Sequence, residues 1–512
     1  MVTATVDVAG LAKNIQDEIF LSTVKRREQG KGIPFPRIKG PTHGDKLCIV
    51  GAGPAGLHLA VELRRSNFTN LVILEKDRRV GGKSFDVDYR GLAQPQGTIF
   101  TTEEYFDNFI PLARRYGVGK LVKFVKPSII DNYKSLELTE YLDRGPLGLL
   151  LAFADAIRYV DLHKELFGSY NGELMPRPGV AVLYRIRGTF AEFLEREDLL
   201  GLSPFFKLSQ TVQGFGYLDE IAAFYGLMWN TPRLMAVHIV KNGRHRVFLL
   251  KEGFQKVWET IQEKENFKIK FNTKLESIQR YSDRVELHSN HGIETCGWLV
   301  WTPPVGTLLE TLDTPTLREE KLLSGQTHVT FTVNLANVRN YKEGPYNVYN
   351  ANLDRKTEHG VTSDGDWRAL ISPYSQSKEG IKHYRKENKR KERTLRSLQL
   401  SRRECSLAQC NQVLSQHYAN LTGFIPEIVH TISWTPYFPR WSPYQVILCC
   451  NAIQPILYSI LTGCSGGQAV GDILYARTGP GMLGPLCLMN PSSLLWSITS
   501  FSLGRWAQYR FE

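Results

Sequence analysis

Residues 46–83, KLCIVGAGPAGLHLAVELRRSNFTNLVILEKDRRVGGK, decide the fold of this 512-residue chain. The apolar run Leu47–Val50 predicts a buried parallel strand, and it leads directly into a glycine-rich turn. His58–Arg65 has the apolar spacing of a helix, and a second apolar run, Leu71–Leu74, predicts the next strand. Strand, glycine turn, helix and strand in this order predict a βαβ unit.

The turn GAGPAG, residues 51–56, predicts a dinucleotide site of the Rossmann type. Its first glycine makes the tight turn, its second lets backbone N–H groups approach a pyrophosphate, and its third lets the helix pack on the strand. The helix N-terminus adds the positive end of its dipole. Glu75 ends the second strand nineteen residues later, where such a unit places the acid that binds a ribose hydroxyl. The candidate cofactor-binding residues are Gly51, Ala52, Gly53, Pro54, Ala55, Gly56 and Glu75.

The doublet Gly81–Gly82, followed by Lys83, adds discrimination between nucleotide cofactors. Together GAGPAG, LEKDRRVGGKS and their spacing resemble the FAD-binding segment of the flavin amine oxidase superfamily, in which the doublet extends the dinucleotide fingerprint. The resemblance implies FAD as the cofactor. It adds Lys76, Gly81, Gly82 and Lys83 to the candidate residues.

Two later segments resemble the same superfamily. PQGTIF, residues 95–100, is similar to a small-residue turn that brings backbone amides near the isoalloxazine ring, which makes Gly97 and Thr98 candidates. The helix start KEGFQKVWETI, residues 251–261, is followed by the strand KLESI and by an apolar strand ending in TPP, as in the superfamily. There the backbone at the position of Leu275 contacts adenine.

The substrate side gives weaker signals. Residues 120–240 read as mostly helical, and the segment 213–230 is dense in aromatic and small residues. Such a stripe is usually core, yet glycines on both sides of Phe215 suggest a close approach of the backbone to a flat group. Phe215 and Tyr217 are therefore pocket candidates, with a core role as the alternative, and the catalytic residues stay unknown.

A strand predicted over 327–338 bears on the chemistry. In many amine oxidases a strand at this place carries a lysine that holds a water at flavin N5, whereas residues 326–337 contain no lysine. This difference counts against amine oxidation by the usual arrangement.

Within the superfamily, GAGPAGL, ILEKDRRVGGKS, GFGY, GFQKVW and YFPRWSP resemble the polyenoic fatty acid isomerases and their relatives, over residues 45–376 and 409–447. The resemblance implies that oxidised flavin takes a hydride from a doubly activated C–H and returns it at another carbon. Two alternatives stay open. One is an amine oxidase-like or desaturase-type flavin oxidase, and the other is a catalytically silent protein with impaired FAD binding.

The expected fold is α/β, with a Rossmann-like FAD-binding domain that holds a parallel sheet and a discontinuous α+β substrate domain. The expected segments are an N-terminal helix and linker (1–44), FAD-binding parts (45–120 and 241–315), substrate parts (121–240 and 316–430, the latter with a basic insert at 377–404) and a last FAD-binding part (431–512) that diverges from about 447.

The distribution of charge and of cysteines limits which partners and which compartment are expected. Residues 378–403 hold eleven Lys or Arg and three acids, which is +8 of the net +12, and the segment is expected to be a solvated helix or disordered insert. It has one aromatic residue, so no nucleic-acid partner is expected. The eight cysteines show neither metal nor disulfide spacing, which predicts no metal and a reducing compartment. No secretory signal is visible, so we expect a cytoplasmic protein. The expected partner is a small apolar or amine substrate. Membrane contact stays open but is not favoured, and the oligomeric state is unknown.

The tail departs from the family pattern after residue 446. Relatives continue to a Trp-Tyr-Ala-Gly turn and a last helix over the flavin phosphate and ribityl, but this chain reads ILCCNAIQPILYSILTGCSGGQAV. Codons for residues 481–500, read two bases late, allow WYAGASVSYESVESVMEYHQ, and they force Glu at the junction of Met489 and Asn490. We hypothesise that the tail is a frame-shifted or mis-spliced reading. An uninterrupted original frame in the mature transcript would contradict this hypothesis.

Overall fold

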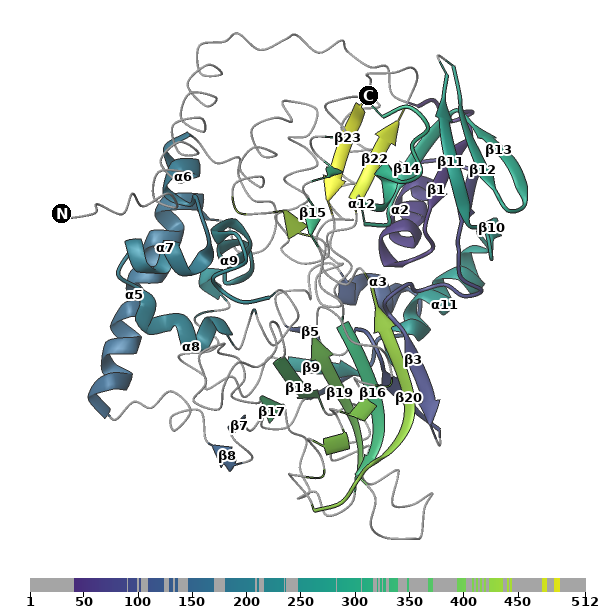
Figure 1. The fold of residues 1–512 in the computed structure, drawn as a ribbon. Helices are drawn as coiled ribbons and strands as arrows, with labels where there is room; N and C mark the ends of the chain where they lie inside the picture. The colour runs from purple at the N-terminus through teal and green to yellow at the C-terminus, as the bar shows by residue number, and fades with distance from the viewer. Residues whose placement is uncertain are drawn as a thin grey trace, which may run out of the picture.

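The computed structural model describes residues 41–89, 91–98, 109–123, 146–169, 180–207 and 216–233, most of 247–315, and shorter segments up to residue 488. Residues 1–40, which hold the expected N-terminal helix, lie outside the described residues. Figure 1 shows three groups of elements: a sheet around β1 and β14, a cluster of helices from α5 to α9, and a second sheet around β16.

A parallel sheet carries the glycine-rich turn. β1 (Leu47–Val50) pairs in parallel with β2 (Leu71–Leu74) on one side and with β14 (Trp298–Trp301) on the other. β10 (Ile269–Lys270) pairs in parallel with β2. All residues of β1, β2 and β14 are buried, as expected for parallel strands covered on both faces. The predicted βαβ unit and parallel sheet are confirmed.

Three helices surround the glycine turn and the parallel sheet. α2 (Pro54–Arg65) follows the glycine turn, and α11 (Gln255–Glu265) packs against it. Trp258 of α11 is almost fully buried. α3 (Phe109–Arg115) joins α11 because its Phe109 ring stacks on Phe254, with 5.4 Å between the ring centroids.

A three-stranded antiparallel sheet lies beside the parallel one (Figure 1). It consists of β11 (Leu275–Arg280), β12 (Val285–Ser289) and β13 (Gly292–Cys296). A disulfide joins Cys296 of β13 to Cys48 of β1, and their Cα atoms are 5.9 Å apart. The interpretation that the cysteine spacing indicates no disulfide was therefore wrong. The two cysteines are 248 residues apart, and the parallel pairing of β1 with β14, which begins two residues after Cys296, brings them together.

A five-stranded antiparallel sheet forms the second group. Its order is β17 (Val348–Tyr349), β18 (Trp367–Ile371), β19 (Thr394–Ser401), β16 (Phe331–Val338) and β20 (Glu427–Trp434). β19 lies inside the basic segment 377–404, so the prediction of a solvated helix or disordered insert was wrong for these residues. Backbone hydrogen bonds to β18 and β16 hold β19, and such pairing does not depend on side-chain charge.

Helices form the third group. A capping box starts α7, in which the Thr189 side chain accepts from the Glu192 N–H and the Glu192 side chain accepts from the Thr189 N–H. The Tyr159 hydroxyl of α5 donates to the Asn230 carbonyl at 2.7 Å. The helices are α5 (Pro146–Phe167), α6 (Val180–Arg185), α7 (Phe190–Arg196), η2 (Leu200–Leu202), α8 (Ser203–Phe206) and α9 (Ala223–Trp229).

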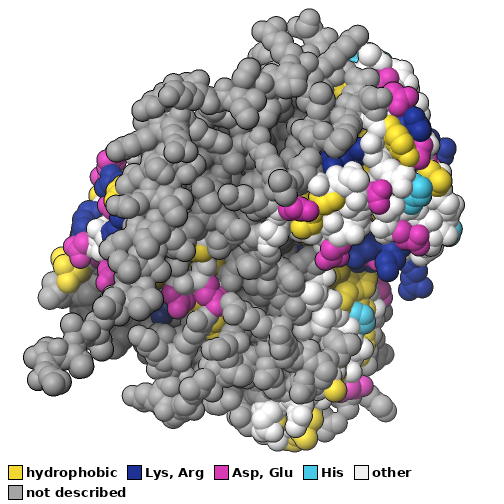
Figure 2. All heavy atoms as spheres, turned by 45° about the horizontal axis from the view of Figure 1, so that its top comes forward, with side chains coloured by type: hydrophobic (Ala, Val, Ile, Leu, Met, Phe, Trp, Pro, Cys, Tyr) yellow, Lys and Arg dark blue, Asp and Glu magenta, His cyan; other side chains and the backbone are white. Residues whose placement is uncertain are grey.

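The first turns of α5 have two different sides. Ala152 and Ala156 are buried, whereas Leu150 is 65% and Leu151 57% exposed, so only one side of this segment belongs to the core. None of the helices in the described part of the chain combines the length and the apolar character that crossing a bilayer requires. Figure 2 shows acidic and basic side chains interspersed on the described part of one face.

The tail adds two strands to the parallel sheet in the opposite sense. β22 (Asp472–Ala476) pairs antiparallel with β14, and β23 (Leu483–Leu488) pairs antiparallel with β22. The other short elements are β3 (Asp86–Tyr89), β4 (Leu92–Pro95), β5 (Thr101–Thr102), β6 (Leu121–Lys123), β7 (Ile129–Asp131), β8 (Lys134–Leu136), β9 (Val247–Leu250), α12 (Gly306–Leu309), β15 (Gln326–Thr327) and β21 (Arg440–Trp441).

Candidate cofactor-binding site

The glycine turn needs its glycines for backbone reasons. Gly51 has φ of +97°, and a Cβ there would lie 2.5 Å from the Thr302 hydroxyl. A Cβ on Gly56 would collide with the carbonyl oxygen of Gly51. Thr302, directly after β14, donates from its hydroxyl to the Val50 carbonyl at 2.6 Å and so fixes the end of β1. The roles assigned to the first and third glycines agree with this geometry.

The N-terminus of α2 presents unpaired backbone donors. Gly53 is the N-cap, no side chain caps the helix, and Pro54 occupies its first turn. Within the described part of the chain, the N–H groups of Gly53, Ala55 and Gly56 have no acceptor. A twelve-residue helix that begins with free N–H groups and no acid in its first turn favours an anion such as a pyrophosphate.

Glu75 lies beside this turn and is 6% exposed. Its carboxylate accepts from the Ala52 N–H at 2.6 Å and from the Asp77 N–H at 2.9 Å. Burial raises the pKa of this carboxyl, and the two N–H groups offset part of the rise. The acid predicted to bind a ribose hydroxyl is therefore held at the turn, and Lys76 beside it is exposed.

The doublet Gly81–Gly82 packs directly on the glycine turn. The Gly81 N–H donates to the Ala52 carbonyl at 2.9 Å. Arg79 holds the doublet from the other side, because its guanidinium donates to the Gly82 carbonyl at 2.8 Å and lies 4.3 Å from the centre of the Phe85 ring. Sequence reasoning did not single out Arg79, because Arg78 next to it offered the same charge.

Lys83, Gly97 and Thr98 form one local structure. The Thr98 N–H donates to the Lys83 carbonyl at 3.1 Å, and the Thr98 and Ser84 hydroxyl oxygens are 3.1 Å apart. Trp434 of β20 donates from its indole to the Gln96 carbonyl at 2.7 Å. The segment that resembles the flavin turn therefore connects the doublet with the five-stranded sheet.

Leu275 begins β11 at the Glu75 end of the site. The Thr273 N–H donates to the Glu75 carbonyl at 2.8 Å, and the Asn272 N–H to the Asp77 carbonyl at 3.1 Å. These bonds place the segment before Leu275 beside the acid, which agrees with the adenine contact that the resemblance implies. Leu275 itself is half-buried.

A buried carboxyl that sequence reasoning missed joins β3 to α11. The Asp86 carboxylate accepts from the Gln255 N–H at 2.7 Å, and the Gln255 side chain accepts from the Asp86 N–H at 3.0 Å. The residue as a whole keeps some exposure, but its Oδ1 atom is fully shielded and unpaired. Burial raises the pKa of Asp86 to about 7. Its charge and two-residue spacing from Asp88 gave no signal of this contact.

The pocket candidates are not brought to this site by any described contact. Phe215 lies outside the described residues. Tyr217 is 5% exposed and belongs to the hydrophobic core, where its carbonyl accepts from the Ile221 N–H at 3.1 Å. A core role is the better description of Tyr217.

The arrangement fits an adenine dinucleotide. Free N–H groups at the start of α2 suit the pyrophosphate, and Glu75 suits the ribose. Gly53 of the turn and Gly82 of the doublet face each other. A Cβ on either glycine would lie within 4 Å of the Cα atom of the other, so the backbone is accessible here only because both residues lack a side chain. Fold and site together place the chain among proteins with a Rossmann-type dinucleotide fold.

The comparisons with known proteins identify the family. Residues 54–336, more than half of the chain, match the model of the flavin-containing amine oxidoreductases. The chain belongs to this family. The superfamily that the motifs resemble is thereby confirmed.

The relatives agree on the fold. The polyenoic fatty acid isomerase of Ptilota filicina is 26% identical over 209 residues, which are 37% of this chain and 42% of that protein's length. A fatty acid isomerase of P. acnes that produces CLA has a crystal structure with a TM-score of 0.69 and 16% identity, over 92% of this chain and all of the other. Cyclohexylamine oxidase from Brevibacterium oxydans has a TM-score of 0.56 and 12% identity, over 80% of this chain and 91% of the other.

Proposed function

We propose that this chain is an FAD-dependent oxidoreductase or isomerase that removes a hydride from an apolar substrate, such as a polyunsaturated fatty acid, and returns it to another carbon. When bound, FAD supplies the hydride acceptor and donor. Gly51, Gly53, Gly82 and Glu75 would hold its dinucleotide part. The fatty acid isomerases among the similar proteins support the choice of substrate.

The observation that carries the proposal is the side-chain content of β16. The strand reads FTVNLANV and contains no lysine. Val333 and Leu335 are fully buried, and β20 places Ile432 opposite Val333. Trp434, on the same face of β20, reaches the turn at Gln96. The wall next to the turn is therefore apolar, which suits a hydrocarbon substrate and excludes water.

The titratable group on this wall is His430 of β20. It lies opposite Leu335, and its ring centroid is 5.9 Å from that of Phe85. Burial lowers the pKa of His430, so its imidazole is uncharged at neutral pH. A neutral imidazole adds no charge to this part of the wall, which suits the hydrocarbon part of a substrate.

Anaerobic incubation of the FAD-loaded protein with a polyunsaturated fatty acid tests the proposal. Conjugated-diene absorbance without consumption of oxygen is the expected result. Peroxide formation in air without conjugated product would instead assign an oxidase, of the amine oxidase or desaturase type. A matched incubation with a saturated fatty acid of the same length is the control, because it lacks the doubly activated C–H.

A second candidate is a catalytically silent protein with impaired FAD binding. The observation that favours it is the antiparallel direction of β22 and β23, since relatives place a flavin-covering helix after the corresponding part of the chain. Pure protein that stays colourless after addition of FAD would support this candidate. Stoichiometric uptake of FAD would contradict it.

A further inference from the structure

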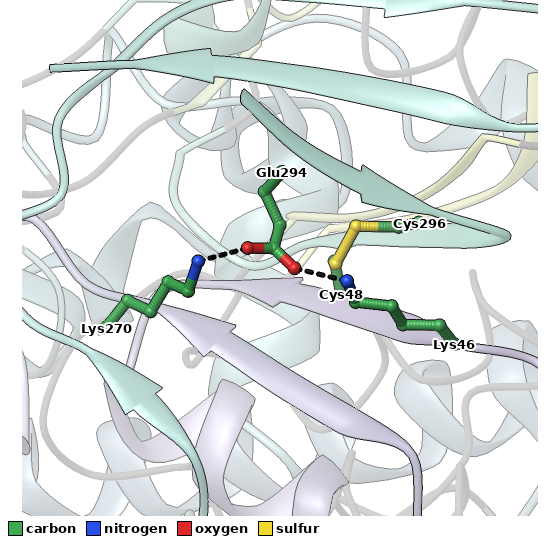
Figure 3. The surroundings of a disulfide bond; sticks show 5 residues. All are labelled: Lys46, Cys48, Lys270, Glu294 and Cys296. Atoms are coloured by element: carbon green, nitrogen blue, oxygen red, sulfur yellow. Dashed lines mark hydrogen bonds and ion pairs between the residues drawn. A yellow bond between two sulfur atoms is a disulfide. The ribbon is translucent and has the colours of Figure 1, made fainter. Parts of the chain in front are cut away.

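Two residue pairs with the same spacing face each other between β1 and β13. Lys46, directly before β1, lies two residues from Cys48, as Glu294 lies two residues from Cys296 in β13, and in extended chain residues at this spacing point to the same side. The Lys46 ammonium lies 2.5 Å from Glu294, and Cys48 is bonded to Cys296. Lys270 of β10 contacts the second carboxylate oxygen (Figure 3). The disulfide therefore lies in a cluster of two ammonium groups and one carboxylate.

The two ammonium groups and the Glu294 carboxylate, which lies next to the sulfur atoms, together carry a charge of +1. A Glu294 oxygen and both sulfur atoms lie within 4.8 Å of one another. Burial alone would raise the pKa of Glu294, but hydrogen bonds and charge from Lys270 and Lys46 outweigh it and lower that pKa, so the carboxylate is ionised. The neighbouring Asp45 carboxylate accepts from the Trp298 indole at 3.1 Å. Positive charge next to a cysteine stabilises its thiolate.

The two sulfur atoms differ in how an external thiol could reach them. Cys48 lies in the middle of the parallel sheet, with β2 and β14 on its two sides. Cys296 ends β13, which in the described part of the chain pairs with β12 alone and is an edge strand. Both residues are at most 1% exposed, so reaction requires β13 to open locally from the edge.

We propose that Cys48 and Cys296 form a reversible redox pair that exchanges electrons with cellular thiols, and that the reduced pair holds one sulfur as a thiolate beside Lys46 and Lys270. A thiolate attacks the Cys296 sulfur, forms a mixed disulfide with it and releases Cys48 as a thiolate. A second thiolate breaks the mixed disulfide and releases Cys296, which takes up a proton. Two external thiols become one disulfide, two electrons pass to the protein, and one proton goes to solvent.

A metal ion is the competing occupant of the reduced pair. Two thiolates and the Glu294 carboxylate would make three ligands of the kind that zinc accepts. The two ammonium groups, however, already engage both carboxylate oxygens, and their charge opposes a dication. The geometry therefore favours the thiolate over the metal.

The test is redox equilibration of the full-length protein without cofactor. The protein is held in buffers of different reduced-to-oxidised glutathione ratios, quenched, alkylated with a maleimide and digested, and the peptides of Cys48 and Cys296 are quantified by mass spectrometry. Both cysteines should pass together from disulfide to thiol within the glutathione range. A pair that stays oxidised in the most reducing buffer, or stays reduced in the most oxidising one, would overturn the proposal.

Variants test the role of the positive charge. Lys46→Met should shift the equilibrium about tenfold towards the disulfide, which corresponds to about 30 mV. The matched control is Lys256→Met, an exposed lysine of α11 that should leave the midpoint unchanged. Equal midpoints for Lys46→Met and the wild type would contradict the thiolate assignment.

Two measurements on the reduced wild-type protein complete the design. Alkylation by iodoacetamide should reach half its maximal rate at a pH below 8.5, the ordinary pKa of a cysteine thiol. An ordinary midpoint would contradict the proposal. Addition of zinc chloride should give no stoichiometric uptake that depends on Cys48. Zinc uptake by the wild type that a Cys48→Ser variant lacks would replace the redox pair by a metal site.

Discussion

Replacing Glu75 by Gln should weaken both the glycine turn and the binding of FAD. The carboxylate is 6% exposed and accepts from the Ala52 and Asp77 N–H groups at 2.6 and 2.9 Å. Glutamine keeps the shape but has one acceptor oxygen, so one of the two backbone donors would face an NH₂ group. The variant therefore leaves a buried donor unpaired.

The structure sets the size of the effect. A hydrogen bond to a charged acceptor contributes about 1.5–3 kcal/mol. Burial raises the pKa of Glu75 because it disfavours the charged carboxylate, so the uncharged glutamine avoids this cost and part of the lost hydrogen-bond energy is offset. We expect the free energy of unfolding to fall by about 1–2 kcal/mol. A ribose hydroxyl that loses its carboxylate acceptor weakens FAD binding by about 1.5–3 kcal/mol, which is roughly 10- to 150-fold.

The assay has two parts. Urea unfolding of the cofactor-free protein, followed by tryptophan fluorescence, measures the stability change, and titration with FAD measures the affinity. Glu276→Gln is the matched control, because Glu276 is exposed on β11 and its replacement should change the unfolding free energy by less than about 0.5 kcal/mol. If Glu75→Gln unfolds at the wild-type urea concentration and binds FAD with wild-type affinity, the assignment of this acid is wrong.

Three further predictions concern the surroundings of the site. Gly56→Ala should lower the free energy of unfolding in urea by about 3 kcal/mol, because its Cβ would collide with the Gly51 carbonyl. Gly44→Ala is the control and should be nearly neutral, because a Cβ there has no atom within 4 Å. Equal urea midpoints for the two variants would refute the close contact at Gly56. Burial raises the pKa of Asp86 from 3.8 to about 7, so between these pH values the native state holds a proton that the unfolded state has lost. This proton contributes at most about 4 kcal/mol to the free energy of unfolding. The contribution is fully present below pH 4 and is lost as the pH rises to 7. Asp86→Asn should therefore flatten the fall in unfolding free energy over that window, and an unchanged pH profile would count against the buried carboxyl. Trp434→Phe removes the indole donor to Gln96 and should cost about 1 kcal/mol, or about 1 °C in the thermal midpoint of a chain of this length, measured by calorimetry. A midpoint equal to that of the wild type would show that this hydrogen bond does not stabilise the fold.

The sequence predicted the nucleotide side of the fold well because its signals are local. β1 and β2 have the bounds that their apolar runs indicate, and α2 starts inside the glycine turn. The turn itself depends on glycines whose collisions are with atoms a few residues away, or with Thr302 at the end of an equally apolar strand. Local pattern and tertiary packing require the same residues here, so a single sequence is sufficient.

The features that the sequence did not predict depend on distant partners. Cys48 meets Cys296, and Asp86 meets Gln255, across 248 and 169 residues. Neither spacing carries a signal, because the first contact exists only after β1 has paired with β14 and the second only after β3 has packed on α11. β19 was missed for a different reason. The charge density of its segment suggested solvent, although a strand needs only its backbone partners.

The direction of β22 limits what the tail can contribute to the cofactor site. In a sheet of this type the ligand lies outside the carboxyl ends of the parallel strands, where β1 ends and α2 begins. β22 runs antiparallel to β14, with Leu474 opposite Trp301, so the chain enters β22 at that edge and leaves it at the opposite one. A helix that directly followed β22 would therefore begin at the wrong end of the sheet to offer its N-terminus to the ligand. We expect the cofactor to be held mainly by the α2 turn and Glu75, with slow loss of FAD on dilution. Tight, stoichiometric binding in a titration of the cofactor-free protein would show that another part of the chain completes the flavin end.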